Sequence, residues 1–356
     1  MKGRKMDSSK LVYIRFMNAL RKILFPFALL YEGIIRLRNA CFDRGILTTR
    51  SYDFPVICVG NLSVGGTGKT PMVEYLIRLF QPQYTVATLS RGYGRKTKGF
   101  YRLNGKESAT QTGDEPLQFK MKFPEVLVTV GEDRQQGIAK IKAQQPHLDV
   151  ILLDDAYQHR KVTPGFSILL TAYGALYTAD RMLPVGNLRE PKSGAQRADV
   201  VVVTKCPSDI SIAEQKHIQQ ELSLMPEQQL YFTKIGYADA VFNAEEECDL
   251  KELPTNFCLV TGIAKPEPLV HYLKNRQLTF RHRRFKDHHH FSAKEIAQLQ
   301  KERCIITTEK DYMRLKSSIQ SPSLYYLPIQ QEFVGNKEGF DAKIKTWVER
   351  VLQREA

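Results

Sequence analysis

The sequence predicts an α/β fold: a parallel sheet with helices on each side, followed by a second, smaller α/β/α domain. Two observations predict this class. Short runs filled almost continuously with Val, Ile and Leu recur along the chain, which is typical of strands buried on both faces. Helical patterns lie between several of these runs, and 356 residues are enough for two domains.

The runs and patterns fall into two sets. The first predicts strands at 56–60, 84–89, 126–130, 149–153, 167–171 and 200–204, with helices near 69–80, 115–122 and 133–145. The second predicts strands near 257–261, 278–282, 304–307 and 324–327, with helices near 266–274, 292–302, 309–317 and 339–353. We therefore expect a basic N-terminal region at 1–50, a core domain at 51–235 and a smaller domain at 236–356.

Positive charge is concentrated near the start of the chain. The net charge is +14, and residues 1–50 contain eleven Lys and Arg against three Asp and Glu. Such a surface implies an anionic partner, which is nucleic acid, anionic lipid or a phosphorylated substrate. The apolar fraction of 42% and the charged fraction of 25% exclude a disordered or fibrous chain. The six cysteines form no C-x-x-C pair and fit a reducing compartment.

Residues 11–38 form a basic amphipathic segment. On a helical wheel, most charged side chains fall in one arc and most apolar side chains in the opposite arc. The longest charge-free run, 23–31, contains Pro26 and is shorter than the ~20 apolar residues that a spanning helix needs. Pro26 is expected to kink the helix. Two interpretations stay open: a helix that lies in a membrane interface, and a helix that packs on the protein's own core.

A strand, a glycine-rich turn and a helix follow one another at 55–80, which is the context of a phosphate loop. Glycines let backbone N–H groups approach phosphate oxygens, and the helix N-terminus adds a positive dipole. Lys69 is expected to reach the β- and γ-phosphates and Thr70 to ligate Mg²⁺. The pattern predicts a P-loop NTPase-like core that binds a nucleotide; the alternative is an ordinary strand-to-helix turn. The expected binding residues are Ser63, Gly65, Gly66, Thr67, Gly68, Lys69 and Thr70.

Two adjacent acids end the predicted strand at 149–153. Asp154 and Asp155 occupy the Walker B position, where a carboxylate at the C-terminal end of a strand holds Mg²⁺ directly or through water. Two such acids beside a phosphate site would repel each other without a cation. The alternative is a polar strand end with no metal.

Four further features are candidates for chemistry. Arg91 and Arg95 follow the strand at 84–89 and suit charge neutralisation near phosphate. Asp114 opens a helical pattern, as either its N-cap or a carboxylate that accepts a hydroxyl proton. The histidine-rich stretch at 285–291 is either a solvated loop, an adventitious metal site or half of an acid–base pair. The basic residues at 281–286 form a patch that can receive a substrate phosphate.

Eight motifs together resemble the tetraacyldisaccharide 4′-kinase family, the lipid A 4′-kinases of Gram-negative bacteria. The resemblance covers about residues 11–350. The motifs are Gly60-Asn-Leu-Ser-Val-Gly-Gly-Thr-Gly-Lys-Thr-Pro71, Leu89-Ser-Arg-Gly-Tyr-Gly-Arg95, Gly113-Asp-Glu-Pro116, Leu153-Asp-Asp-Ala-Tyr-Gln-His-Arg160, Leu183-Pro-Val-Gly-Asn-Leu-Arg-Glu-Pro191, Val203-Thr-Lys205, Phe285-x-Asp-His288 and Thr308-Glu-Lys-Asp311.

The resemblance implies an enzyme that transfers the γ-phosphate of ATP to the 4′-hydroxyl of a tetraacylated glucosamine disaccharide 1-phosphate, with Mg²⁺ as cofactor. It implies a peripheral or monotopic protein on the cytoplasmic face of the bacterial inner membrane, bound to an anionic membrane surface and not to nucleic acid. It also implies two α/β/α domains whose cleft closes around the nucleotide.

The same resemblance assigns roles to individual residues. Lys69 and Thr70 match the phosphate-loop Lys and Thr, and Asp154 and Asp155 match the Walker B acids. Asp114 matches the catalytic base, and His288 matches the histidine that pairs with it, although three consecutive histidines leave this choice open. Ala156-Tyr157 stands where the family usually has Gly-Phe.

Two other classes compete with this reading. A P-loop switch or metal-handling NTPase also carries a Gly-Gly-x-Gly-Lys-Thr core, and the three histidines offer it a metal site. Its usual lysine before the glycine pair is missing, because Ser63-Val64 stands there. A nucleic-acid-binding protein is less favoured because no recognised module is present.

Overall fold

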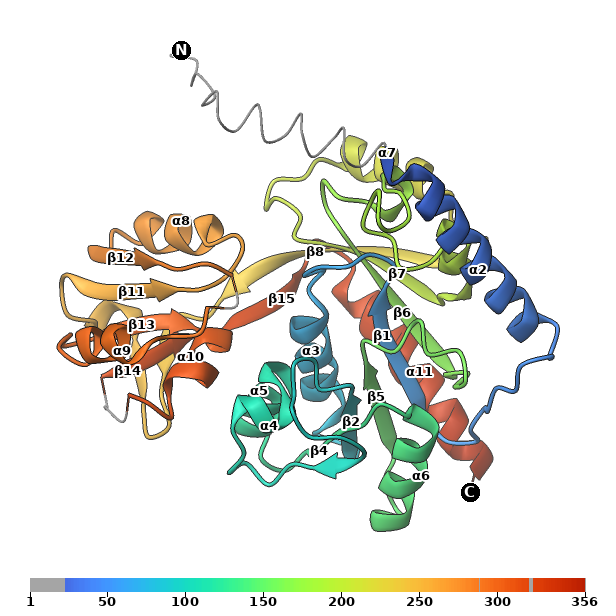
Figure 1. Ribbon diagram of the computed structural model, residues 1–356, viewed down its shortest axis with the longest axis horizontal. Helices are drawn as coiled ribbons and strands as arrows, with labels where there is room; N and C mark the ends of the chain where they lie inside the picture. Colours follow the sequence, from blue (N-terminus) through green and yellow to red (C-terminus); the bar gives the residue numbers. More distant parts are fainter. Residues whose placement is uncertain (1–22, 288, 320–322, 356) are drawn as a thin grey trace. The chain divides into compact units, whose positions relative to one another are not determined.

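The computed structural model describes residues 23–287, 289–319 and 323–355, which belong to two compact units (Figure 1). Unit 1 comprises the chain up to residue 69 together with 155–233 and 333 onward, and unit 2 comprises 70–154 and 234–332. Residues 11–22 of the predicted amphipathic segment and His288 lie outside the described residues. The domain division at 50/51 and 235/236 stays a prediction.

Unit 1 contains four parallel strands in the order β8-β7-β6-β1. β1 and β7 are buried at every residue, as expected for strands that are covered on both faces. The register pairs Asn61 with Leu170 and Thr204 with Ala172, which brings the C-terminal ends of β1, β6 and β7 to one edge of the sheet. The strands are β1 (Val56–Asn61), β6 (Phe166–Ala172), β7 (Val200–Thr204) and β8 (Gln229–Tyr237), the last of which continues into unit 2.

Three helices accompany these strands: α2 (Phe25–Asp43), α7 (Ile212–Leu222) and α11 (Lys337–Glu355). α11 packs against β6, with the ring centroids of Trp347 and Phe166 5.3 Å apart. Pro26 lies in the first turn of α2, where a missing N–H costs no helical hydrogen bond. The kink expected at Pro26 stays a prediction, because residues 11–22 of the same segment lie outside the described residues. None of the described helices is long and apolar enough to cross a membrane.

The first part of unit 2 contains strands in the order β5-β2-β4-β3, of which β5, β2 and β4 are parallel. They are β2 (Val86–Ser90), β3 (Tyr101–Arg102), β4 (Leu127–Val130) and β5 (Val150–Asp154). The accompanying helices are α3 (Lys69–Phe80), α4 (Ala109–Thr112), α5 (Asp114–Lys122) and α6 (Arg134–Gln144). Met72, Val73, Leu76, Ile77 and Phe80 are the buried apolar residues of α3, at the spacing of a helical stripe.

A six-stranded sheet forms the second part of unit 2, in the order β10-β9-β14-β13-β11-β12. Alternate residues of β11 enter different cores: Cys258 and Val260 share one with residues of α9 and α10, whereas Phe257 and Leu259 share one with residues of α8. Figure 1 shows α8 on one side of this sheet and α9 and α10 on the other. The strands are β9 (Ala240–Phe242), β10 (Glu247–Asp249), β11 (Phe257–Thr261), β12 (Phe280–Arg284), β13 (Ile305–Thr308) and β14 (Leu324–Leu327), and β15 (Ile329–Phe333) follows. The helices are α8 (Glu267–Asn275), α9 (Ala293–Leu299) and α10 (Glu309–Leu315).

The mixed α/β architecture predicted from the sequence is confirmed. Each strand and helix predicted from residue 56 onward has a counterpart whose ends differ from the prediction by three residues at most. The sequence did not predict several short or polar elements: α4, α7, β3, β8, β9, β10 and β15.

Candidate active site

The predicted phosphate loop joins β1 to α3. Gly65 and Gly68 have φ angles of +106° and +86°, a conformation that glycine adopts without strain. Asn61 Nδ2 donates to Thr67 Oγ1 at 2.9 Å, and Thr204 Oγ1 donates to the Thr67 carbonyl at 2.8 Å. Side chains at the ends of β1 and β7 therefore hold the buried Thr67 in the middle of the loop.

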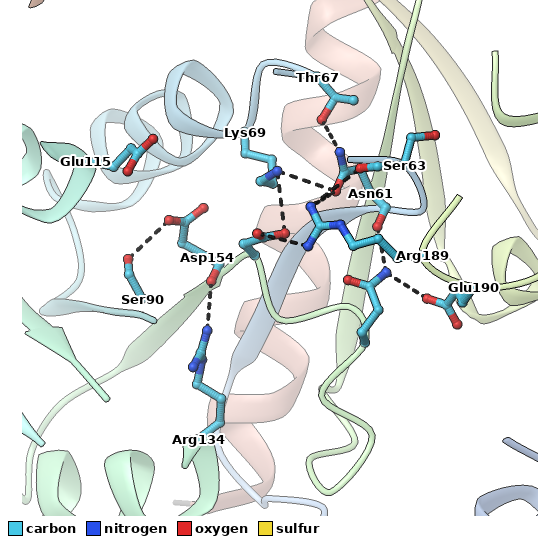
Figure 2. Close-up of polar contacts among 12 residues, drawn as sticks. Asn61, Ser63, Thr67, Lys69, Ser90, Glu115, Arg134, Asp154, Arg189 and Glu190 are labelled. Atoms are coloured by element: carbon cyan, nitrogen blue, oxygen red, sulfur yellow. Dashed lines mark hydrogen bonds and ion pairs between the residues drawn. The ribbon is translucent and has the colours of Figure 1, made fainter. Parts of the chain in front are cut away.

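Lys69, the first residue of α3, faces a carboxylate within unit 1 (Figure 2). Its Nζ lies 3.4 Å from Asp155 Oδ1 and 3.4 Å from Asn61 Oδ1. Arg189 contacts the other side of the same carboxylate, with NH1 3.2 Å from Asp155 Oδ2. One carboxylate thus lies between two cations beside the glycine-rich loop.

Asp155 is held ionised by these neighbours. Burial acts to raise the pKa of Asp155, but Lys69 and then Arg189 outweigh it, so the pKa lies below its ordinary value. The backbone of Asp155 has a φ of +48°, and its N–H donates to the Val59 carbonyl at 3.0 Å. A non-glycine residue in this conformation marks a constrained position, of the kind that recurs at functional sites.

Arg189 also ties the loop to helix α2. Its NH2 donates to Asn61 Oδ1 at 3.1 Å and to the Ser63 carbonyl at 3.4 Å. Its own carbonyl accepts a 3.0 Å hydrogen bond from the Tyr31 hydroxyl of α2. Gln158 connects the end of β1 to the residue after Arg189, because its Nε2 donates to the Asn61 carbonyl at 2.7 Å and to Glu190 Oε1 at 2.8 Å.

Asp154 ends β5 and belongs to unit 2. Its carboxylate is buried and accepts a hydrogen bond from Ser90 Oγ at 3.1 Å (Figure 2). The guanidinium of Arg134, whose residue is 2% exposed, donates to the Asp154 carbonyl at 3.4 Å and to the Gly131 carbonyl at 2.6 Å. These contacts fix both the backbone and the side chain at the end of the strand.

Arg95 has a structural partner that differs from the sequence interpretation. Its NH2 donates to Glu132 Oε1 and to the Gly99 carbonyl, both at 2.6 Å, and its side chain is only 3% exposed. Glu132 in turn accepts from the Gly99 N–H at 3.0 Å. Arg95 therefore closes its own loop, whereas Arg91 is exposed.

Asp114 is the first residue of α5, and Gly113 is the N-cap, so the N-cap interpretation of Asp114 is wrong. Gly113 has a φ of +93°, and a Cβ there would lie 3.1 Å from the Tyr93 carbonyl oxygen, so glycine is required. The Asp114 carboxylate binds Arg314 of α10, whose Nε lies 3.1 Å from Oδ2 and whose NH2 contacts the same oxygen. Both side chains are largely buried, with 18% and 12% exposed.

Of the three histidines, His288 lies outside the described residues, so its pairing with Asp114 stays a prediction. His289 has a partner of its own, since its Nε2 lies 3.1 Å from Glu295 Oε2 and its ring stacks on Phe285 at 4.8 Å. Hydrogen bonds from Ser292 and then from His289 lower the pKa of Glu295 to about 2. His289 is therefore part of the local packing at the start of α9.

The basic patch at 281–286 is partly neutralised within unit 2. Arg281 forms an ion pair with Glu302, and Arg284 forms one with Glu267 at 3.0 Å. Arg283 NH2 donates to Gln298 Oε1 at 2.7 Å. These arginines of β12 are thus bound to side chains of α8, α9 and the turn after α9, which weakens the interpretation of the patch as a phosphate receptor.

A family model described as tetraacyldisaccharide-1-P 4′-kinase matches residues 20–349. The chain belongs to this family. The resemblance inferred from the eight motifs is therefore confirmed, and the chain is a kinase.

Individual members of the tetraacyldisaccharide 4′-kinase family are closely similar to this chain. The protein of that name from Flavobacterium johnsoniae is 51% identical over 344 residues, which are 95% of this chain and 100% of the relative. That from Bacteroides thetaiotaomicron is 43% identical, over 90% of each chain. A crystal structure of the Aquifex aeolicus family member, described as an "apo" form in complex with ATP, has a TM-score of 0.74 and 31% identity, and covers 93% of this chain and 99% of that chain.

The structure adds functional candidates that the motifs did not single out in this member of the family. Asn61, Gln158 and Arg189 lie inside quoted motifs, but no spacing rule indicates that they meet. Arg134 and Arg314 lie outside them. The five share one feature: each is a polar side chain, buried or partly buried, that donates hydrogen bonds to a predicted site residue or to its neighbours.

Proposed function

We propose that this chain transfers the γ-phosphate of ATP to the 4′-hydroxyl of a tetraacylated glucosamine disaccharide 1-phosphate, in lipid A biosynthesis. Membership of the tetraacyldisaccharide 4′-kinase family supports the reaction. The observation that supports a role for particular residues is the contact of Lys69 with Asp155 beside a glycine-rich loop.

ATP is the proposed phosphate donor. The solved Aquifex aeolicus relative is described as a complex with ATP, and its likeness extends over nearly the whole of both chains. Lys69 would exchange its contact with Asp155 for the β- and γ-phosphates, where its charge offsets the charge that develops on the transferred group. The other residues proposed to bind the phosphates are Ser63, Gly65, Gly66, Thr67, Gly68 and Thr70.

The donor set fits Mg²⁺, which prefers hard oxygen ligands and is held in such sites by one or two carboxylates. We assign this role to the hydroxyl of Thr70 and the carboxylates of Asp154 and Asp155. The low pKa of Asp155 supports the assignment, because the carboxylate is available as an anion at neutral pH. When bound, the ion would neutralise charge on the phosphates.

Asp114 is the proposed general base, paired with His288. It would accept the proton of the 4′-hydroxyl as that oxygen attacks the γ-phosphorus and the bond to ADP breaks. Replacing Asp114 with Ala is expected to lower turnover far more than ATP affinity. Unchanged turnover in this variant would remove the base assignment.

Helix α2 is proposed to lie in the anionic surface of the inner membrane, on its cytoplasmic face. It presents an apolar surface that the protein leaves uncovered, with Phe27, Leu29, Leu30, Ile34 and Leu37 each more than half exposed. The buried Ala28 and Ile35 and the bond from Tyr31 to Arg189 hold the helix to unit 1. This arrangement supports an interfacial helix that is also anchored on the protein.

A vesicle-binding experiment tests the helix. The Leu30→Glu, Ile34→Glu double variant is expected to lose sedimentation with phosphatidylglycerol vesicles while its circular dichroism spectrum is unchanged. Phosphatidylcholine vesicles provide the charge control. Equal sedimentation of the variant and the natural chain with anionic vesicles would contradict the membrane assignment.

The kinase reaction is tested with ATP labelled in the γ-phosphate. Transfer of label to a purified tetraacyldisaccharide 1-phosphate is expected, and Lys69→Ala is expected to abolish it. Release of label to water with no lipid product, together with nickel or zinc binding, would instead favour a metal-handling NTPase. Arg276→Gln, which breaks a surface ion pair with Asp239 in unit 2, is the control variant.

A further inference from the structure

The motif Thr308-Glu-Lys-Asp311 has no role in the reaction proposed above, yet its helix lies against the helix of the proposed base. α10 and α5 run in opposite directions, because Arg314 at the end of α10 meets Asp114 at the start of α5, and Glu309 meets Lys122 at the other ends. Between them Lys310 Nζ lies 2.8 Å from Glu115 Oε1. Each helix has acidic residues in its first turn and basic residues in its last turn, as the helix dipole favours.

The Arg314 contact leaves one oxygen of the base available. Both Nε and NH2 of Arg314 bind Oδ2 of Asp114. Within residues 23–287, 289–319 and 323–355, no side chain or N–H donates a hydrogen bond to Oδ1. A carboxylate held in this way through one oxygen has its rotation restricted and presents the other oxygen as a proton acceptor.

Arg314 is itself held by the motif. Its NH1 lies 3.4 Å from Oδ1 of Asp311, a side chain with no exposed surface. The other oxygen of Asp311 accepts from the Gly262 N–H at 2.7 Å and from Thr308 Oγ1 at 2.8 Å. Thr308 and Asp311 also form the N-cap of α10, because Thr308 Oγ1 accepts from the Asp311 N–H at 3.2 Å. The chain of contacts runs from β11 through Asp311 and Arg314 to Asp114.

We propose that Arg314 is the positioning residue for the base Asp114, and that the Thr308–Asp311 motif holds Arg314 for this task. Arg314 keeps Oδ2 occupied, so that the proton of the acceptor hydroxyl passes to Oδ1 while the hydroxyl oxygen bonds to the γ-phosphorus and ADP leaves with the electrons of the broken P–O bond. This inference rests on the proposed function of Asp114. The motif would then orient the reacting carboxylate of Asp114. Its position in the sequence, 194 to 197 residues after Asp114, does not indicate this role.

The test compares Arg314→Gln with Arg314→Lys in the full chain. Arg314→Gln is expected to lower kcat about 10- to 100-fold, less than the about 10²- to 10⁴-fold that a general base contributes, because the base itself remains. The KM for ATP is expected to change by less than about twofold. Arg314→Lys keeps one charged donor and is expected to recover part of the loss. Arg276→Gln makes the same substitution in another Arg–Asp pair of unit 2 and is expected to leave kcat unchanged.

A double-variant cycle separates positioning from a general structural role. In single-turnover assays, Arg314→Gln is expected to cause no further loss when Asp114 is already Asn, because its effect passes through that carboxylate. An equal loss in both backgrounds would overturn the inference. If Asp114→Asn is inactive but Arg314→Gln and Arg314→Lys are each fully active as single variants, the inference is also overturned. If Asp114→Asn itself keeps full turnover, the proposed function of Asp114 fails first. Should Arg314→Gln not fold, Arg314→Lys decides alone: full activity of this variant, with an unchanged unfolding temperature, would overturn the inference.

Discussion

Replacing Glu309 with Gln is expected to remove a pH dependence from the stability of unit 2. Glu309 is 4% exposed, and its Oε1 shares the ammonium of Lys122 with Glu74, whose Oε2 lies 2.5 Å from Lys122 Nζ. Its Oε2 accepts the Ile329 N–H at 3.1 Å. Burial, followed by the charge of Glu74, raises the pKa of Glu309 to about 7 from an ordinary value of 4.5.

The sign follows from proton binding. Because the folded state holds this proton more tightly than the unfolded state, the contribution to the free energy of unfolding is fully present below about pH 4.5 and is lost as the pH rises through about 7. The difference between the two pKa values corresponds to about 3 kcal/mol. Glutamine resembles the protonated carboxyl in shape and does not titrate, so it lacks this loss.

Urea unfolding followed by circular dichroism at pH 5 and pH 8 measures the effect. The free energy of unfolding of Glu309→Gln, relative to the natural chain, is expected to rise by about 2–3 kcal/mol between these pH values. Glu267→Gln is the control, because the Glu267 N–H and then Arg284 lower the pKa of that exposed carboxyl, so its contribution is already complete at pH 5. A constant difference for Glu309→Gln across this range, or a change in the opposite direction, would refute the reasoning.

Four further substitutions test packing and charge. Gly165→Ala places a Cβ 2.6 Å from Cζ2 of Trp347 and is expected to lower the free energy of unfolding by about 1–3 kcal/mol in thermal melts. At Gly33 an added Cβ would have no atom within 4 Å, so Gly33→Ala is expected to stabilise its helix by about 0.5–1 kcal/mol. Equal melting temperatures for these two variants would contradict the contact. Lys122→Met leaves the buried carboxylates of Glu74 and Glu309 without their shared cation. It is expected to lower the free energy of unfolding by about 3–5 kcal/mol in urea at pH 8, and a decrease below about 1 kcal/mol would mean that the cluster is hydrated. Asp155→Asn removes the partner of Lys69 and is expected to lower phosphate transfer by about 100-fold or more at saturating ATP; near-normal transfer would exclude Asp155 from the reaction.

The sequence predicted those elements whose local pattern alone determines them. β1 and β7 are continuous apolar runs, and the loop before Lys69 has glycines where the backbone takes a positive φ. α7 has few apolar residues, with only Ile218 and Leu222 buried, so its periodicity is weak although Ser211 caps it. β8 shows neither a continuous buried run nor a regular alternation, because three consecutive buried residues are followed by two partly exposed ones. β3 has two residues, too few for any pattern.

The site residues divide in the same way. Lys69 and Asp154 follow recognisable local patterns, but the partners that orient the site are distant in sequence. Arg189 meets Asn61 across 128 residues, and Arg314 meets Asp114 across 200. Such pairs depend on how the sheets and helices pack, and one sequence contains no information on that packing beyond its apolar periodicity. A single chain also does not distinguish His288 from its two neighbours.

The path of the chain between the units has a consequence for its synthesis on the ribosome. Unit 2 has all its residues once position 332 has been made, whereas unit 1, which includes the earliest described helix, still lacks α11. Until then Phe166 lacks Trp347, and Tyr231 lacks Phe340, a ring that is fully buried in the finished protein. At about 5–20 residues per second, β6 waits on the order of ten seconds or more for its cover. A nascent chain of this family therefore exposes an apolar sheet face while the residues between β6 and α11 are made, and it is a natural client for chaperones that bind such surfaces.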